Sequence, residues 1–265
     1  MNIAVCVKQV LDPEMPTDKF WVKDNQVVPP EGIDLVLNPC DAQAVEAALR
    51  VKEKYGGKIT AITVGPAESL EVVRRAVAMG ADEGIVLSDD AFADSDSLAI
   101  AYILARTLEK LDKIDLILCG REAADWSMGI VGPVLAERLN LPLITLAKEI
   151  ELLDNNILKV ERVIPDGTQV FEVSLPAVLT VSNEIGLPRL PTGMGIVSAI
   201  RKKIPVWTSQ DINTDTALIG GDAVGLKLIS LSIPDRERKC EFIKGDTPGE
   251  IADNLAAKLR AAGTL

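Results

Sequence analysis

The chain of 265 residues contains no histidine. Histidine is the side chain that titrates nearest neutral pH, and it is a frequent metal ligand. Its absence excludes imidazole acid–base catalysis, Ser-His and Cys-His nucleophiles and His-ligated metals within this chain. We therefore expect neither a histidine-based catalytic centre nor a metal site.

Cysteine is scarce, and long apolar runs are missing. The four cysteines, Cys6, Cys40, Cys119 and Cys240, form no CxxC motif, and their density is far below that of a disulfide scaffold. The amino terminus has no basic segment before an apolar one, and no run of about 18 apolar residues occurs anywhere. These absences predict a chain without export signal or membrane span, for which a cytoplasmic location is the simplest.

Basic side chains are outnumbered, with 28 Lys and Arg against 39 Asp and Glu, so the formal net charge is −11. Binding to nucleic acid or to an anionic membrane needs clustered Lys and Arg, and we expect neither partner. Hydrophobic residues make up 48% of the chain, which is ample for one large core or two modest ones.

The first 145 residues alternate short β-branched runs with longer amphipathic patterns. Strands are predicted at residues 3–10, 58–64, 84–87 and 115–119. Helices are predicted at residues 41–55 with Asp41 as N-cap, at 68–79, and after the Asp94-Ser95 pair. This alternation is typical of right-handed βαβ crossovers. It predicts an α/β fold over residues 1–205, with a Rossmann-like, mostly parallel sheet and helices on both faces.

After Pro142 the pattern changes. Residues 149–163 and 169–174 alternate like an antiparallel pair around a turn at Pro165-Asp166-Gly167, which predicts a small antiparallel insertion at about 148–175. The apolar run 177–181 reads as a buried strand that returns to the main sheet.

From Asn183 onward glycine and proline interrupt the pattern, and a helical pattern resumes only at 248–262. Residues 206–265 are therefore predicted to be an extended carboxy-terminal arm with a helix. Such an arm lies either against a partner subunit or against its own domain.

Open parallel sheets bind ligands at the carboxyl ends of their strands, and three loops are candidates for that edge. They are residues 7–9 of the first strand region, residues 37–41, which lead into a predicted helix, and residues 120–133, which follow a predicted strand. No G-x-G-x-x-G motif follows the first strand, and no G-x-x-x-x-G-K-[ST] motif exists. Ordinary NAD-binding and P-loop interpretations are therefore excluded.

The third loop has the composition of a phosphate site. Gly129 and Gly132 bracket the start of a predicted helix that runs to about residue 139, where backbone N–H groups and the helix dipole attract an anion without any Lys. The same glycines also suit plain turn geometry. Asp125 either orients a ribose hydroxyl or an amide, or caps the helix region. Trp126 either stacks on a ring or fills the loop.

The cysteines divide by context. Cys6 and Cys119 lie within apolar strand patterns and are predicted core residues. Cys40, between Pro39 and Asp41, is the cysteine that we place near a ligand.

A colinear set of motifs runs from residue 3 to about 205. In order these are Val5-Cys6-Val7-Lys8-Gln9-Val10, Asn38-Pro39-x-Asp41, Gly65-Pro66-Ala67, Ala76-x-Ala78-Met79-Gly80-Ala81-Asp82, Gly120-Arg121-Glu122-Ala123-Ala124-Asp125, Val160-Glu161-Arg162, Leu175-Pro176-Ala177-Val178 and Pro188-Arg189. Together they closely resemble the beta subunit of electron transfer flavoproteins.

The resemblance implies a heterodimer with an alpha subunit whose mobile domain carries the redox FAD. The beta subunit is then an electron-carrier subunit without catalytic residues, and it binds AMP, or a second FAD in electron-bifurcating members. By position, the residues around the adenosine are Cys6, Asn38, Pro39, Cys40, Asp41 and Val64. Those around the ribose and phosphate are Ala123, Asp125, Ser127, Met128, Gly129, Ile130, Val131 and Gly132.

The family also docks acyl-CoA dehydrogenases through a loop after the Pro-Arg pair, here the docking loop at residues 187–198. The corresponding docking residues are Leu190, Thr192, Gly193, Met194 and Ile196. Gly193 stands where members commonly have a Leu anchor, and Met194 is a flexible substitute. Val163 replaces a Glu that we expect to face the flavin domain of the alpha subunit.

Two matters stay open at this point. Trp126, Met128 and Ile130 replace common polar residues of the phosphate loop, so AMP and FAD both remain candidates. An alternative of another class is a stand-alone ATP- or AMP-binding module like the universal stress proteins, although the chain lacks their G-x-x-G-x-G-x-x-G-[ST] pattern. A third alternative is an adenylating enzyme, although no S-G-G-x-D-S-like phosphate loop occurs.

Overall fold

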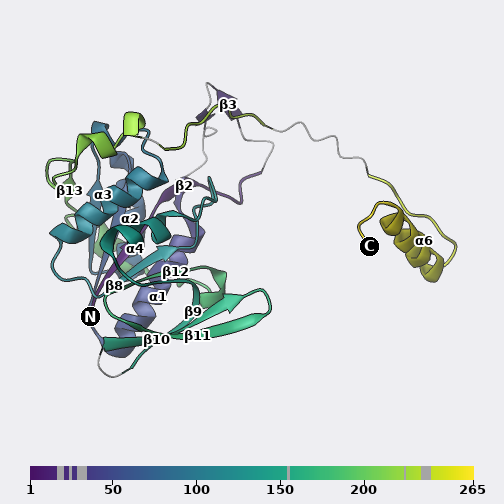
Figure 1. Ribbon diagram of the computed structural model, residues 1–265, viewed down its shortest axis with the longest axis horizontal. Helices are drawn as coiled ribbons and strands as arrows, with labels where there is room; N and C mark the ends of the chain where they lie inside the picture. The colour runs from purple at the N-terminus through teal and green to yellow at the C-terminus, as the bar shows by residue number, and fades with distance from the viewer. Residues whose placement is uncertain (17–20, 24–25, 29–34, 154–155, 224, 234–239) are drawn as a thin grey trace.

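The computed structural model describes residues 1–16, 21–23, 26–28, 35–153, 156–223, 225–233 and 240–265 (Figure 1). Its strands are β1 (Asn2–Cys6), β2 (Gln9–Leu11), β3 (Trp21–Lys23), β4 (Gln26–Val28), β5 (Leu35–Leu37), β6 (Lys58–Val64), β7 (Glu83–Leu87), β8 (Leu116–Gly120), β9 (Leu143–Leu152), β10 (Ile157–Ile164), β11 (Gly167–Ser174), β12 (Ala177–Val181) and β13 (Val206–Trp207). Its α-helices are α1 (Pro39–Tyr55), α2 (Leu70–Met79), α3 (Ser97–Lys110), α4 (Val131–Leu139), α5 (Gly193–Arg201) and α6 (Pro248–Ala261). Short 3₁₀ helices are η2 (Ala67–Ser69), η3 (Asp90–Phe92), η5 (Asn183–Ile185), η6 (Thr216–Leu218) and η7 (Gly221–Ala223).

Nine of these strands form one sheet, in the order β11-β10-β9-β12-β8-β1-β6-β7-β13. Every neighbouring pair from β9 to β13 is parallel, whereas β10 is antiparallel to both β9 and β11. The predicted α/β fold, with a mostly parallel sheet and a small antiparallel insertion, is confirmed. Figure 1 shows the insertion at one end of the sheet.

Helices cover both faces of the parallel sheet. On β1, Ile3 and Val5 belong to the core shared with α1 and α2, whereas Ala4 and Cys6 belong to the core shared with α3 and α4. Successive side chains of a strand point to opposite faces, so burial on both sides requires a continuous apolar run. This is the reason that the central strands were recognisable in the sequence.

Two predicted boundaries at the amino-terminal end are wrong. The single strand predicted at residues 3–10 is two strands, because Lys8 N leaves the sheet to donate to the Asp41 carboxylate and β2 pairs antiparallel with β5. Asp41 is not the N-cap of the first helix. The N-cap is Asn38, and Pro39 opens α1, where its missing N–H costs nothing.

Other predicted boundaries need smaller corrections. Helix α3 is capped by Asp96, whose carboxylate accepts from Leu98 N and Ala99 N, rather than by the Asp94-Ser95 pair. The pattern at 149–163 is not one strand but the hairpin of β9 and β10. The predicted turn before Gly167 and the buried strand at 177–181 are confirmed.

The segment after residue 183 is more regular than predicted. Helix α5 lies within it, and Thr192 caps this helix by accepting a hydrogen bond from Gly195 N at 3.0 Å. A Cβ on Gly195 would lie 2.3 Å from Ala78 O, so glycine permits the close packing of α5 on α2. The glycine at position 195 therefore indicates a close contact between two helices and not an irregular segment.

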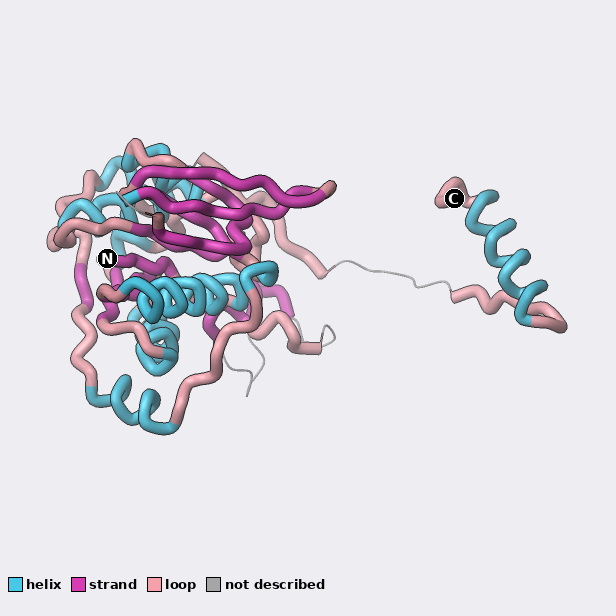
Figure 2. Tube along the Cα trace, turned by 90° about the horizontal axis from the view of Figure 1, so that it is seen from below, coloured by secondary structure: helices cyan, strands magenta, loops and turns pink. Residues whose placement is uncertain are grey.

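Residues 206–223 and 225–226 lie against their own domain. Strand β13 extends the sheet beside β7, and the carboxylate of Asp89 binds Ser209 through both its N and its Oγ. Farther along, Gly225 N donates to the capping carboxylate of Asp96. Helix α6, predicted at 248–262, stands apart from the sheet in Figures 1 and 2. Within the described ranges, the structure contains no helix with the length and apolarity to cross a bilayer.

Candidate functional site

The strand order reverses beside β1. The chain passes from β1 to β6 and β7 on one side, and then places β8 on the other side of β1. Ligands of open parallel sheets bind at such a switch point, outside the carboxyl ends of the strands. Cys6 ends β1, Gly120 ends β8 and Val64 ends β6, so the predicted site residues of these strands share this edge.

Asn38 joins the three predicted loops. Its backbone N donates to Lys8 O at 3.0 Å, its Nδ2 donates to Glu122 O at 2.9 Å, and its Oδ1 accepts from Ala124 N at 3.0 Å. The side chain is fully buried. Because both ends of the amide are used, this residue fixes the loop after β8 against the start of α1.

Asp41 is a buried carboxylate beneath the same loops. Its Oδ2 accepts from Lys8 N at 2.8 Å. Burial raises its pKa to about 7, although hydrogen bonds from Asn38 and from the backbones of Lys8 and Gly120 act in the opposite direction. The residue is therefore poised to change charge near neutral pH.

Gly120 is required by this arrangement. A Cβ at this position would lie 2.2 Å from Asp41 Oδ1 and 2.9 Å from Asp41 N. Lys8 and Gly120 were not predicted as site residues, although both stand in the motifs that carry the resemblance. The signal in the sequence was a glycine that directly ends a predicted strand.

The loop after β8 is held from outside by an ion pair between Lys8 Nζ and Asp125 Oδ2, at 2.5 Å. Asp125 Oδ1 also accepts from Trp126 N at 3.0 Å, so its carboxylate does serve as a local backbone acceptor. The Trp126 side chain is 54% exposed and does not fill the loop.

The predicted phosphate loop leads directly into α4. Ser127 and Gly129 have positive φ values of 48° and 64°, which reverse the chain before the helix. The N-cap, Ile130, makes no side-chain capping hydrogen bond. The first N–H groups of α4 thus have no capping side chain, and an uncapped helix start attracts anions.

Gly132 has a packing role. A Cβ there would lie 2.7 Å from Thr180 Cγ2, so glycine allows α4 to approach β12 and β8 closely. Gly132 therefore serves helix packing rather than turn geometry, whereas the positive φ of Gly129 fits the turn-geometry alternative. The phosphate interpretation of both glycines stays a prediction.

Three of the four cysteines lie beside the candidate site, at the ends of β1 and β8 and at the start of α1. Cys6 and Cys119 are buried on adjacent strands, as predicted, and their hydrogen bond together with burial raises the pKa of the Cys119 thiol. Cys40 lies in the first turn of α1 rather than in a loop, and burial raises its pKa as well.

The predicted docking residues do not belong to this site. Leu190, Thr192, Gly193, Met194 and Ile196 lie before and within α5, which packs on α2. Met194 is 86% exposed and Leu190 is 80% exposed.

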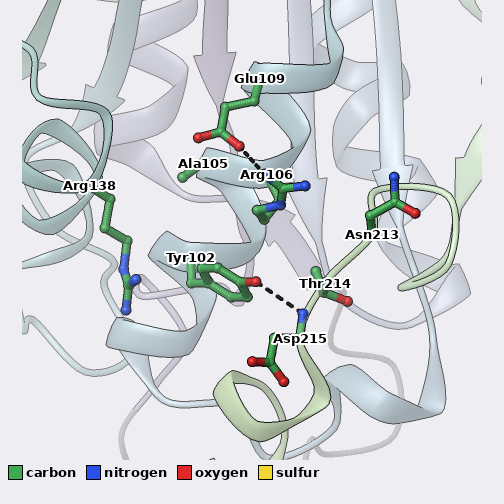
Figure 3. A pocket seen from close by; sticks show the side chains of 8 residues that line it. All are labelled: Tyr102, Ala105, Arg106, Glu109, Arg138, Asn213, Thr214 and Asp215. Carbon is green, nitrogen blue, oxygen red and sulfur yellow. Dashed lines mark hydrogen bonds and ion pairs between the residues drawn. The ribbon is translucent and has the colours of Figure 1, made fainter.

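A separate hollow of about 510 Å³ lies between α3, α4 and residues 213–215 (Figure 3). The two arginines that line it already have partners within the protein. Arg106 pairs with Glu109, and the Arg138 guanidinium lies 5.1 Å from the Tyr102 ring centre. Asp215 N donates to the Tyr102 hydroxyl at 3.0 Å. The switch point therefore stays the stronger candidate.

These features define an open-sheet α/β protein with a candidate ligand site at its switch point. The family model for the electron transfer flavoprotein domain matches residues 27–211. Electron transfer flavoprotein subunit beta of Thermoanaerobacterium thermosaccharolyticum is 36% identical over 98% of both chains. The caffeyl-CoA reductase-Etf complex subunit CarD of Acetobacterium woodii is 37% identical over 98% of both chains. The acryloyl-CoA reductase electron transfer subunit gamma of Anaerotignum propionicum is 34% identical over 86% of this chain and 84% of its own.

The chain belongs to the electron transfer flavoprotein family, among relatives of its beta subunit. This membership confirms the resemblance read from the motifs. It also sets aside the alternative of a stand-alone stress-protein module.

Proposed function

We propose that the chain is the beta subunit of a heterodimeric electron transfer flavoprotein, and that it binds an adenine nucleotide, AMP or FAD, at the switch point. The observation that carries the proposal is the buried amide of Asn38, which joins the three loops at the carboxyl ends of β1 and β8. The uncapped start of α4 beside them suits a phosphate in an acidic protein.

The residues of the proposed site contact different parts of the nucleotide. Cys6, Val64 and the segment 38–41 surround the adenosine, and the segment 123–132 holds the ribose and phosphate. A flavin, when bound, supplies the electron transfer, while the protein binds and positions it. No side chain of this chain takes part in a covalent step.

The identity of the nucleotide is tested by the cofactor content of the heterodimer, co-expressed with its alpha subunit. Acid extraction and chromatography measure AMP, and flavin absorbance measures FAD. One FAD with one AMP defines a single-flavin shuttle, and two FAD without AMP define a two-flavin form, as in bifurcating members. The Asn38→Ala variant is expected to lose this nucleotide, whereas Glu83→Gln, at the opposite edge of the sheet, retains it. A stable, nucleotide-free wild-type monomer contradicts the proposal.

The alpha subunit is proposed to cover the carboxy-terminal arm. Phe242, Leu255 and Leu265 are exposed apolar residues on this arm, and α6 stands away from the body of the chain. Exposed apolar surface of this kind marks an interface. Because residues 206–223 and 225–226 bind their own domain, the informative truncation removes only residues 240–265. We expect it to abolish heterodimer formation while the thermal unfolding of the remaining domain is unchanged. A truncated chain that still assembles refutes this assignment.

The docking loop is proposed to bind an acyl-CoA dehydrogenase-type partner. One relative is named as a subunit of a caffeyl-CoA reductase-Etf complex and another as an electron transfer subunit of acryloyl-CoA reductase, which supports a partner of this chemistry. Leu190 and Met194 present the exposed apolar side chains for it. Replacing both by Ser is expected to raise KM for the dehydrogenase and to leave kcat unchanged. Unchanged KM contradicts the docking assignment.

A further inference from the structure

The docking loop exposes apolar side chains without a core of its own. Leu187, Leu190 and Met194 are each at least 80% exposed. Ordering a short exposed segment costs conformational entropy. In the free protein, apolar side chains that point to solvent make no contacts that offset this cost. Something else in the molecule must hold the segment in place.

The amino-terminal side of the loop is held by charges on α1. Arg189 Nε donates to Glu46 Oε2 at 2.8 Å, and Arg189 N donates to the same oxygen at 3.1 Å. Arg189 also pairs with both carboxylate oxygens of Glu53, at 2.5 and 3.1 Å. A guanidinium that meets two carboxylates has one well-defined orientation, because its donors form a rigid fork.

A second arginine completes the contact. Arg50 Nε donates to Glu46 Oε1 at 2.9 Å, and its Nη1 donates to Ile185 O at 2.6 Å. Glu46, Arg50 and Glu53 are spaced so that they share one face of α1. The Glu46 side chain is only 6% exposed, so water screens these contacts weakly. We call Glu46, Arg50 and Glu53 the α1 clamp.

The other side of the loop is held by packing. Thr192 caps α5, and Gly195 and Ala199 lie against α2. The residues between Arg189 and Gly195 are therefore tied at both ends and left exposed between them.

We propose that Arg189, held by the α1 clamp, is the positioning residue that presents the docking loop to the acyl-CoA dehydrogenase partner in a binding-ready conformation. This inference rests on the proposed docking function. The clamp reduces the ordering that binding would otherwise require, so its loss weakens docking without changing electron transfer within the bound complex. Arg189 itself touches neither the partner nor the nucleotide in this role.

The test uses the complete heterodimer and the acyl-CoA dehydrogenase with which the wild-type heterodimer turns over. The variants are Arg189→Met, which keeps the aliphatic stem, Arg189→Lys, which keeps the charge, and Glu53→Gln. The matched control is Glu83→Gln, because Glu83 is 52% exposed against 57% for Glu53, and it pairs with Lys58 at 2.7 Å far from the loop.

We expect Arg189→Met to raise KM for the dehydrogenase by about tenfold, the effect of restoring about one residue of backbone freedom to the free loop. The kcat and the flavin absorbance spectrum should not change. Glu53→Gln and Arg189→Lys should raise KM less, and Glu83→Gln should not. Hydrogen–deuterium exchange at residues 186–193 should be faster in Arg189→Met than in the wild type.

Unchanged exchange in Arg189→Met overturns the inference, because the clamp then does not order the loop. Faster exchange with unchanged KM also overturns it, provided that the variant with Ser at positions 190 and 194 does raise KM. If that Ser variant leaves KM unchanged, it is the docking function that fails.

Discussion

The Asp41→Asn substitution replaces a buried carboxyl group by an amide of the same shape, and it should change how stability depends on pH. Asp41 lies beneath the loops of the switch point, where burial raises its pKa from 3.8 to about 7. The folded protein therefore holds a proton on this group over a pH range in which the unfolded chain has lost it. Stability is highest at low pH, where both states are protonated at this site, and it falls as the pH rises from about 4 through 7.

The magnitude follows from the two pKa values. The free-energy cost of an ionisable Asp41 is about 2 kcal/mol at about pH 5 and about 4 kcal/mol at about pH 8, because a shift of one pKa unit corresponds to about 1.4 kcal/mol. The Asn variant does not titrate. It loses about 1 kcal/mol at every pH, because an NH₂ group, which cannot accept hydrogen bonds, replaces one of the two oxygens of Asp41. Between about pH 5 and about pH 8, its stability should therefore rise by about 2 to 3 kcal/mol relative to the wild type.

The assay is urea unfolding of both proteins at the two pH values, at one fixed concentration of heterodimer, followed by circular dichroism. The other titrating groups are the same in both proteins, so they cancel in the difference. If the difference between variant and wild type changes by less than about 0.5 kcal/mol, Asp41 is already ionised at the lower pH and the reasoning from burial is refuted.

Three further predictions concern single contacts. Gly120→Ala should lower the free energy of unfolding in urea by about 2 to 4 kcal/mol, because its Cβ would lie 2.2 Å from Asp41 Oδ1. The control Gly193→Ala should be neutral, because the space around its Cβ is open. Equal stability of the two variants contradicts this reasoning. Asn38→Ala should speed hydrogen exchange at residues 122–124, and unchanged exchange shows that the loop is held by other contacts. Thr192→Ala should cost about 1 kcal/mol and speed exchange at the start of α5, and an unchanged first turn refutes the capping role.

Parts of the fold that depend on local pattern were predictable from the sequence. The buried strands β6, β8 and β12 are predominantly apolar, because both of their faces are covered. The α/β class follows from their alternation with amphipathic helices. The position of the candidate site at the carboxyl ends of the strands follows from the parallel topology itself.

The predicted ends of strands and helices were wrong where a long-range contact overrides local propensity. The predicted first strand is interrupted at Lys8, because its N–H binds a carboxylate 33 residues away. Asp41 has the composition of an N-cap, yet the chain uses Asn38 for that position and buries Asp41 instead. Helix α5 was missed because Gly193 and Gly195 weaken a helix by propensity, and only the surface of α2 shows why glycine is needed at position 195.

By itself the sequence determined the class of fold, the edge of the sheet that carries the loops, and the family, because these depend on periodicity and on ordered short motifs. The tertiary structure decided which side chains meet. No local rule predicts that Arg189 contacts Glu46 and Glu53, which are 143 and 136 residues away. Nor does one predict that Asp41 lies so close to position 120 that only glycine fits there. Such contacts are set by how α1 packs across the sheet, and packing is a property of the whole chain.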